Sequence, residues 1–136
     1  MLRTKGFLHI TIGVTDLSRA TEFYQNVLGC ELVHKNPIMS FMKSGEDFFV
    51  LTVTGCHVPP NPAGEPAAEN TLFHHAMVID DLAFEDVVAE LHSRGIPTYD
   101  CSGAGHSTFP NRRHVYVKDP DGNSIELVTD PVPATV

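Results

Sequence analysis

The chain has no tryptophan, only three cysteines and few basic residues among its 136 positions. The cysteines, Cys30, Cys56 and Cys101, are far apart and odd in number, and none belongs to a CxxC pair. They therefore predict neither a disulfide framework nor a thiolate zinc site, and they suit a reducing cytoplasm. Nine Lys and Arg residues against 17 Asp and Glu residues give a net charge of −8. This balance argues against nucleic acid or an anionic membrane surface as a partner.

Long apolar runs are also missing. No stretch approaches the ~20 apolar residues needed to span a bilayer, and the first residues, MLRTKGFLHI, lack the apolar core of a signal peptide. We therefore expect a cytoplasmic protein without a membrane partner. The length suits one domain, residues 1–136, with a real hydrophobic core. Histidine, in contrast, is abundant, and its eight copies favour a metal or acid–base site.

One short pattern occurs twice. Residues 9–17, HITIGVTDL, align without a gap to residues 74–82, HHAMVIDDL, 65 positions later. In each copy a strand with alternating apolar residues leads into an amphipathic helix, which ends near Gly29 in the first copy and Gly95 in the second. Asp16 is the expected N-cap of the first helix.

Strands are expected after each helix. Residues 31–42 and 46–53 have strand character in the first copy, and residues 114–128 form a hairpin around the turn Asp119-Pro120-Asp121-Gly122 in the second. A repeat of this kind predicts two similar units packed as a pair, each with the order strand, helix, three strands. The predicted fold is α+β, with two tandem βαβββ modules that form a curved mixed sheet. Module one spans about 6–56, a Pro-rich linker about 57–71, and module two about 72–130.

Glu126 stands out because it is a carboxylate on a strand that must be largely buried. Burying an unpaired carboxylate costs several kcal/mol, so a cation or strong donor should lie beside it. His9 and His74 occupy matching positions of the repeat, on the sheet face opposite the helices. Two imidazoles and one carboxylate suit a divalent metal, Fe(II) or else Mn(II), Zn(II) or Ni(II). The alternative is that Glu126 pairs with Arg112 or Arg113 and that the histidines are core residues.

Two further assignments depend on position within the repeat. The ungapped alignment places His74 at the position of His9, and it places His75 among the helix-facing apolar residues, so His74 is favoured over His75 as the ligand. Val50 is the expected counterpart of Glu126 in module one. A fourth protein ligand would then be missing, which leaves metal positions open for substrate, O₂ or water.

The chain resembles the vicinal oxygen chelate superfamily, which includes glyoxalase I, extradiol ring-cleaving dioxygenases, fosfomycin-resistance enzymes and bleomycin-binding proteins. The resemblance covers residues 7–130 and rests on the segments HITIGVTDL, FYQNVLG, HHAMVIDDL and VYVKDPDGNSIEL. It implies paired βαβββ modules and metal ligands at His9, His74 and Glu126. It also implies a homodimer, in which one site can draw its ligands from both chains.

The C-terminal block is most similar to the ring-cleavage signature of the extradiol enzymes. This likeness implies catalytic roles for His106 and Tyr116, with His57 or His114 as alternatives to His106 and with Arg113 near the substrate. It favours an Fe(II) dioxygenase that acts on a small catecholic or related bidentate oxygen substrate, in a pocket with apolar walls such as Phe48, Phe109 and Met39. The alternatives are a fosfomycin-type thiol transferase, a glyoxalase-like lyase and a metal-free antibiotic-binding protein.

Overall fold

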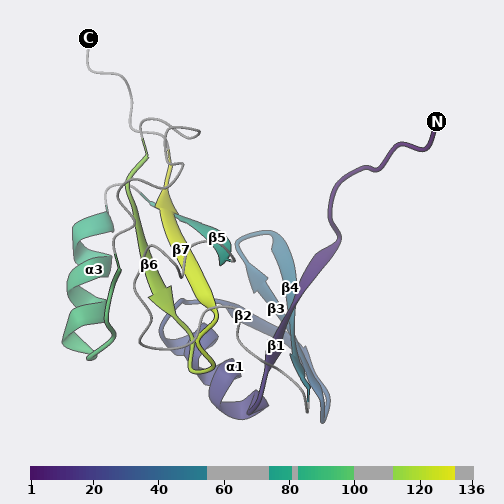
Figure 1. The fold of residues 1–136 in the computed structure, drawn as a ribbon, viewed down its shortest axis with the longest axis horizontal. Helices are drawn as coiled ribbons and strands as arrows, with labels where there is room; N and C mark the ends of the chain where they lie inside the picture. Colours follow the sequence, from purple (N-terminus) through teal and green to yellow (C-terminus); the bar gives the residue numbers. More distant parts are fainter. Residues whose placement is uncertain (55–73, 81–82, 100–111, 131–136) are drawn as a thin grey trace. The chain divides into compact units, whose positions relative to one another are not determined.

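The computed structural model describes residues 1–54, 74–80, 83–99 and 112–130. The chain divides into two compact units, residues 1–58 and residues 59–136. The boundary falls within the segment 57–71 that was predicted as a linker, and that segment lies outside the described residues. Each unit contains its own hydrogen-bonded sheet and its own helix (Figure 1).

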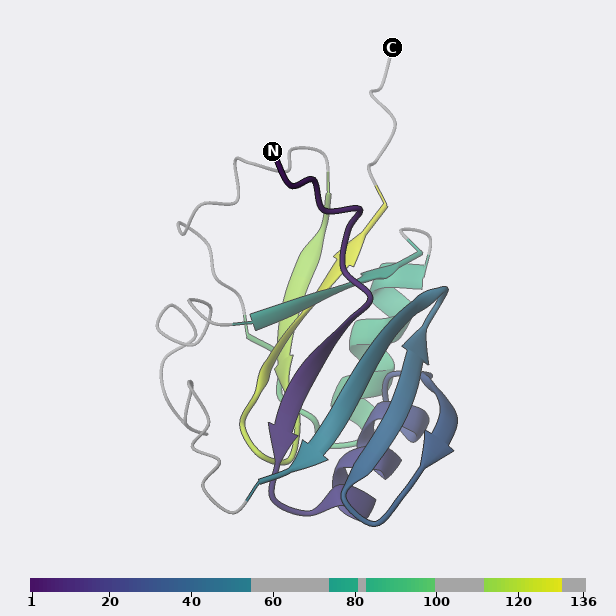
Figure 2. The ribbon, with the colours of Figure 1, turned by 90° about the vertical axis from the view of Figure 1, so that its right-hand side faces the viewer.

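The first unit is a four-stranded mixed sheet with one helix on one face. Its strands are β1 (His9–Val14), β2 (Glu31–Lys35), β3 (Met39–Ser44) and β4 (Asp47–Val53). They lie in the order β1-β4-β3-β2, with β1 parallel to β4 and the other neighbours antiparallel. The helix α1 (Leu17–Asn26) follows β1 and lies behind this sheet in Figure 2. It leaves the opposite face of the sheet uncovered by helix.

Helix α1 begins and packs as the sequence predicted. The Asp16 side chain accepts a hydrogen bond from the Arg19 N–H at 3.0 Å, which satisfies a backbone donor of the first turn. The buried face of α1 carries Leu17, Ala20, Thr21 and Tyr24. The Thr21 and Ser40 hydroxyls lie 2.8 Å apart and are both buried, so a polar contact fastens the helix to β3.

The segment 31–42 contains two strands separated by a tight reversal, not one continuous strand. The Asn36 side-chain oxygen accepts hydrogen bonds from the N–H groups of Ile38 (3.0 Å) and Met39 (2.8 Å). Pro37, between them, has no N–H to give to a sheet. An Asn side chain that bonds the backbone two residues on is a turn in its own right, and this local geometry ends β2 and starts β3.

The second unit repeats the design. Its strands β5 (His74–Ile79), β6 (His114–Lys118) and β7 (Ser124–Thr129) lie in the order β5-β7-β6, again with one parallel and one antiparallel pair. Beyond β6, the N–H and C=O groups of Tyr99 are hydrogen-bonded to Tyr116 at 2.8 and 2.9 Å. Tyr99 therefore lies where β2 lies in the first sheet. The predicted α+β class with two similar modules is confirmed.

Helix α3 (Phe84–Ser93) covers the second sheet from one side (Figure 1). Leu91 is its buried residue. The guanidinium of Arg113, just before β6, lies 4.7 Å from the centre of the Phe84 ring, and Arg113 Nη1 lies 2.5 Å from Glu85 Oε1. A cation–π contact and an ion pair therefore fix the start of the helix against the edge of the sheet.

The turn between β6 and β7 is built around the buried carboxylate of Asp119. This carboxylate accepts hydrogen bonds of 2.9 Å from the N–H groups of Asp121 and Asn123 and from the Asn123 side chain. Gly122 has a φ of 83°, which explains why glycine occupies the closing position. The turn holds β6 and β7 in the register that brings Tyr116 opposite Glu126.

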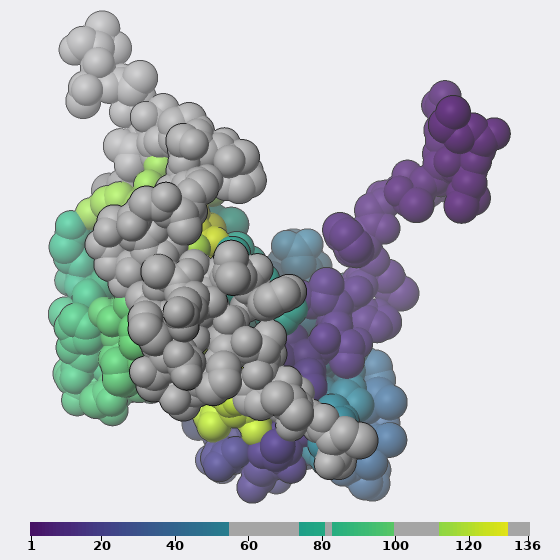
Figure 3. All heavy atoms as spheres, viewed as in Figure 1, coloured from purple at the N-terminus to yellow at the C-terminus, as the bar shows by residue number. Residues whose placement is uncertain are grey.

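At the other end of the chain, residues 1–8 extend beyond the start of β1 (Figure 3). Met1, Leu2 and Phe7 are at least 90% exposed there. None of the helices formed by the described residues is long and apolar enough to cross a membrane.

Candidate functional site

Glu126 and His74 meet on adjacent strands of the second sheet. Their strands β7 and β5 are parallel, with Ala76 paired to Glu126 and His74 paired to Ser124, so that both side chains lie on the same face. His74 Nε2 lies 3.1 Å from Glu126 Oε2, and the two side chains are 29% and 14% exposed. The partner that the Glu126 carboxylate requires is therefore the imidazole of His74, on strand β5.

His75 lies on the other face of β5. It pairs with Ile125, a fully buried residue, and it alternates with His74 along the strand. Burial lowers the pKa of His75, the neighbouring His74 lowers it further, and Asp119 acts weakly in the opposite direction. A neutral imidazole turned toward the core follows from this position. His74, not His75, shares a face with Glu126.

Tyr116 lies directly opposite Glu126 in the antiparallel pairing of β6 and β7. It is 2% exposed, and its ring makes edge-on contacts with His74 (centroids 5.4 Å apart) and with His114 (6.3 Å). Cross-strand pairs of this kind hold side chains at a fixed separation. Four predicted residues of the second unit, His74, His114, Tyr116 and Glu126, are thus brought together on one face.

The two arginines considered as partners of Glu126 make other contacts. Arg112 Nη1 donates a hydrogen bond of 2.8 Å to the Thr129 carbonyl, and Arg113 pairs with Glu85 of α3. Arg113, predicted near the substrate, therefore contacts the helix that covers the sheet. The close contact of the Glu126 carboxylate is with His74, at 3.1 Å.

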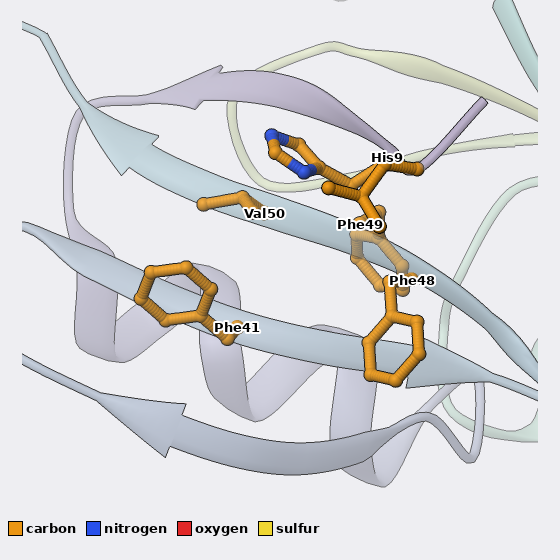
Figure 4. Close-up of a pocket in the computed structure, with 6 residues that line it drawn as sticks. His9, Phe41, Phe48, Phe49 and Val50 are labelled. Carbon is orange, nitrogen blue, oxygen red and sulfur yellow. The ribbon is translucent and has the colours of Figure 1, made fainter.

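His9 lies in the first unit, beside an apolar pocket of about 340 Å³ on the face of the sheet opposite α1. The pocket is lined by Leu8, His9, Phe41, Phe48, Phe49 and Val50. Figure 4 shows the Phe41 and Phe48 rings on one side of the strand that carries Val50 and the His9 imidazole on the other side. The five lining residues other than His9 are apolar, so the walls favour an apolar or aromatic group.

The two sheets have equivalent registers. Thr11 and Phe41 flank Val50 in the first sheet as Ala76 and Tyr116 flank Glu126 in the second. This agrees with the prediction that Val50 is the counterpart of Glu126. The same comparison makes Phe41 the counterpart of Tyr116.

An imidazole nitrogen and a carboxylate oxygen are donors that a divalent metal accepts. The contact of 3.1 Å between His74 Nε2 and Glu126 Oε2 brings two such donors together in the second unit. Within either unit, the described residues include no group of three His, Cys, Asp or Glu side chains that could hold an ion. His57 and His106, the other predicted catalytic candidates, lie outside the described residues, as does Phe109.

Two residues that the sequence patterns do not single out belong to the surroundings of the pocket. Phe41 lines it, and Lys43, two positions further along β3, lies over the Phe48 ring. Alternation along β3 places Phe41 and Lys43 on the same face of the sheet. This alternation can be applied only when the start of β3 is known, and Asn36 sets that start because it ends β2. Phe48 lines the pocket as expected, whereas Met39 does not.

Comparison with known proteins was consistent across sequence and structure. The chain is 30% identical over 134 residues to biphenyl-2,3-diol 1,2-dioxygenase 3 of Rhodococcus globerulus, a match that covers 96% of this chain and 66%, slightly under two thirds, of that protein. It is 28% identical over 129 residues to the fosfomycin resistance protein FosX of Mesorhizobium japonicum, covering 92% and 86% of the two chains.

A solved structure of FosX from Listeria monocytogenes, in complex with Mn(II) and a sulfate ion, has the same fold with a TM-score of 0.69. It is 19% identical, and the match covers 94% of both chains. The family model for the Glyoxalase/Bleomycin resistance protein/Dioxygenase superfamily matches residues 6–127. This confirms the resemblance that the repeated strand and the C-terminal block indicated. The chain belongs to the Glyoxalase/Bleomycin resistance protein/Dioxygenase superfamily.

Proposed function

We propose that the protein is a metal-dependent enzyme in which His9, His74 and Glu126 hold one divalent ion. The observation that carries this proposal is the pair formed by His74 and Glu126, with a nitrogen and an oxygen 3.1 Å apart on one sheet face. His9 is the third ligand because it has the same position in β1 that His74 has in β5, at the start of the strand and on the same face. The ligands come from both units, either of one chain or of two chains in a homodimer.

The reaction that this site supports best is ring cleavage of a small catechol by an Fe(II) dioxygenase. The relative with 30% identity is described as a dioxygenase of biphenyl-2,3-diol, which is a catechol. Aromatic walls beside His9 suit a planar ring, and Val50 offers no carboxylate that would fill a fourth position. Mn(II), Zn(II) and Ni(II) are the other ions that such ligands accept.

The chain's own residues have separate tasks in this proposal. A bound divalent ion would supply Lewis acidity that lowers the pKa of the catechol hydroxyls. The Tyr116 hydroxyl, on the strand next to Glu126, donates a hydrogen bond to a substrate oxygen. His106, or His114 in its place, accepts a proton from the substrate and returns it later. Phe41 and Phe48 hold the ring and exclude water.

A second candidate is ring opening of the epoxide in fosfomycin. It is favoured by the similarity to FosX of Mesorhizobium japonicum, which extends over 86% of that protein. The Lys- and Ser-rich phosphonate loop expected for that reaction is not evident in the sequence, and this places it second. A glyoxalase-like lyase is less compatible because Val50 stands where a fourth ligand would be. A metal-free binding protein would have no need of the His74–Glu126 pair.

Purification without oxygen, followed by metal analysis and by O₂ uptake with catechols, tests the proposal. We expect stoichiometric iron, O₂ consumption and a yellow ring-cleavage product. Manganese with consumption of fosfomycin, by an added thiol or by water, would favour the second candidate, and protein that binds no metal at all would contradict both. Sedimentation velocity of the same sample tests the proposed homodimer.

A further inference from the structure

A lysine contacts one of the residues that line the apolar pocket in the first unit. The register places His9, Phe48 and Lys43 side by side on the neighbouring strands β1, β4 and β3. Lys43 Nζ lies 5.4 Å from the centre of the Phe48 ring. The pocket wall formed by Phe48 therefore has an imidazole on one side and an ammonium group on the other.

The charge of Lys43 is only weakly compensated. Its ion pair with Glu46 has a long N···O distance of 3.8 Å, and the Glu46 side chain is 98% exposed. Such pairs contribute little because water screens them. The Lys43 side chain itself is 23% exposed and leans on an aromatic ring, which raises the strength of any further ionic contact. The Lys43 ammonium group is therefore a partly desolvated cation with which a ligand anion can pair.

The separation between His9 and Lys43 suits one benzene ring with a polar group at each end. Adjacent strands lie about 4.8 Å apart, so β1 and β3 are about 10 Å apart across β4. In the register, Phe48 lies between His9 and Lys43, and Val50 and Phe41 form the next row on the same face; His9 and these three residues line the pocket of about 340 Å³. One end of the row from His9 to Lys43 has the chemistry to bind hydroxyl oxygens through a metal, and the other has the chemistry to bind an anion.

We propose that the substrate is an aromatic acid whose ring lies between Phe41 and Phe48 and whose carboxylate pairs with Lys43. This inference rests on the proposed function for the placement of the two hydroxyl oxygens near His9. The carboxylate contact itself needs only the first unit. A net charge of −8 repels anions in general, so a dedicated cation is the means by which this protein would select one.

The test uses two fluorescent ring compounds that differ in charge, salicylate and salicylamide. The chain has no tryptophan, so ligand fluorescence can be followed without interference from indole. Titrations are made with chelator-treated full-length protein, so that neither metal nor turnover contributes. The variants are Lys43→Met, Lys43→Arg and, as a matched control, Lys35→Met, since Lys35 is an exposed lysine of β2 whose Nζ lies 3.4 Å from Ser18 Oγ.

We expect the native protein to bind salicylate at least about tenfold more tightly than salicylamide. Lys43→Met should abolish this preference, Lys43→Arg should retain most of it, and Lys35→Met should leave it unchanged. Equal affinity for the two compounds, or a preference that survives Lys43→Met, would overturn the proposal. Failure of the dioxygenase assay with the salicylate preference intact would count against the proposed reaction alone, because the binding assay contains no metal.

Discussion

Val50 and Glu126 occupy the same register position in two sheets of the same design. The Val50 side chain is apolar, whereas the Glu126 side chain is ionisable. Each is flanked by a parallel strand on one side and an antiparallel strand on the other. The neighbour on the antiparallel strand is Phe41 in the first sheet and Tyr116 in the second. The two sheets therefore differ at matching places: the first has apolar and aromatic side chains there, and the second has a carboxylate and a phenol.

Glu126→Gln should remove the metal and keep the fold. The amide preserves the size of the side chain but loses the charge and one acceptor, so we expect metal content to fall at least about tenfold. Metal analysis of anaerobically purified protein and urea unfolding measure the two effects. Glu46→Gln, at a 98% exposed side chain, is the matched control. Unchanged metal content in Glu126→Gln would show that the carboxylate is only structural.

Replacing each of the adjacent histidines separates the two faces of β5. His74→Ala should lose the metal because its Nε2 is the atom beside Glu126. His75→Leu should keep the metal, since His75 alternates with His74 and joins the helix-facing residues Met77 and Ile79. Metal content of both variants decides the matter. The opposite result would mean that the strand register at the site differs from the one described.

Tyr116→Phe should slow turnover without affecting metal content. Loss of a positioned hydroxyl that donates to a reacting oxygen is expected to lower kcat roughly 100-fold. Steady-state O₂ uptake with the best catechol substrate measures this change. Tyr99→Phe is the control, because Tyr99 pairs with Tyr116 through backbone groups and retains its ring under Lys118. Equal turnover by Tyr116→Phe and native enzyme would remove the tyrosine from the mechanism.

Cys30 should be protected from thiol reagents by folding. Burial raises the pKa of its thiol from 9.0 to about 11, and a hydrogen bond with Ser44 offsets this only in part. In a Cys56→Ser/Cys101→Ser background, we expect disulfide reagents at pH 8 to label Cys30 about 100-fold more slowly in the folded protein than in urea. Rapid labelling of Cys30 in the folded protein would contradict its buried position.

The same shift predicts how stability depends on pH. The pKa of the Cys30 thiol is higher in the folded state than in the unfolded state. The thiol therefore contributes to the free energy of unfolding below pH 9.0, and this contribution is lost as pH rises toward about 11. Urea unfolding across this range should show a steeper loss for the native protein than for Cys30→Ala. The same pH dependence in the native protein and in Cys30→Ala would contradict the raised pKa.

The elements with strong local signals were predictable from the sequence. Asp16 marks the start of α1 because a side-chain acceptor is needed there, and the turn before β7 follows from Asp119, Pro120 and Gly122. Alternation along β5 was sufficient to place His74 on the face of Glu126. These features depend on contacts a few residues apart or on a strict period of two.

Features that depend on strand pairing were harder to predict. The reversal at Asn36 is stabilised by its own side chain, which a search for glycine turns does not detect. The position of Lys43 over Phe48 follows from the pairing of β3 with β4, and pairing becomes certain only when the length of the reversal is known. The contact of Tyr116 with His114 and His74 likewise requires the order of three strands.

The most direct test of the central claim is a crystal structure of the metal-loaded protein, with the ion located by anomalous scattering at its absorption edge. One ion per chain is expected, with an imidazole nitrogen of His9, one of His74 and a carboxylate oxygen of Glu126 each about 2.0–2.2 Å away, within one chain or across a dimer. An ion bound elsewhere, or the imidazoles of His9 and His74 beyond reach of Glu126 in every pairing of subunits, would contradict it.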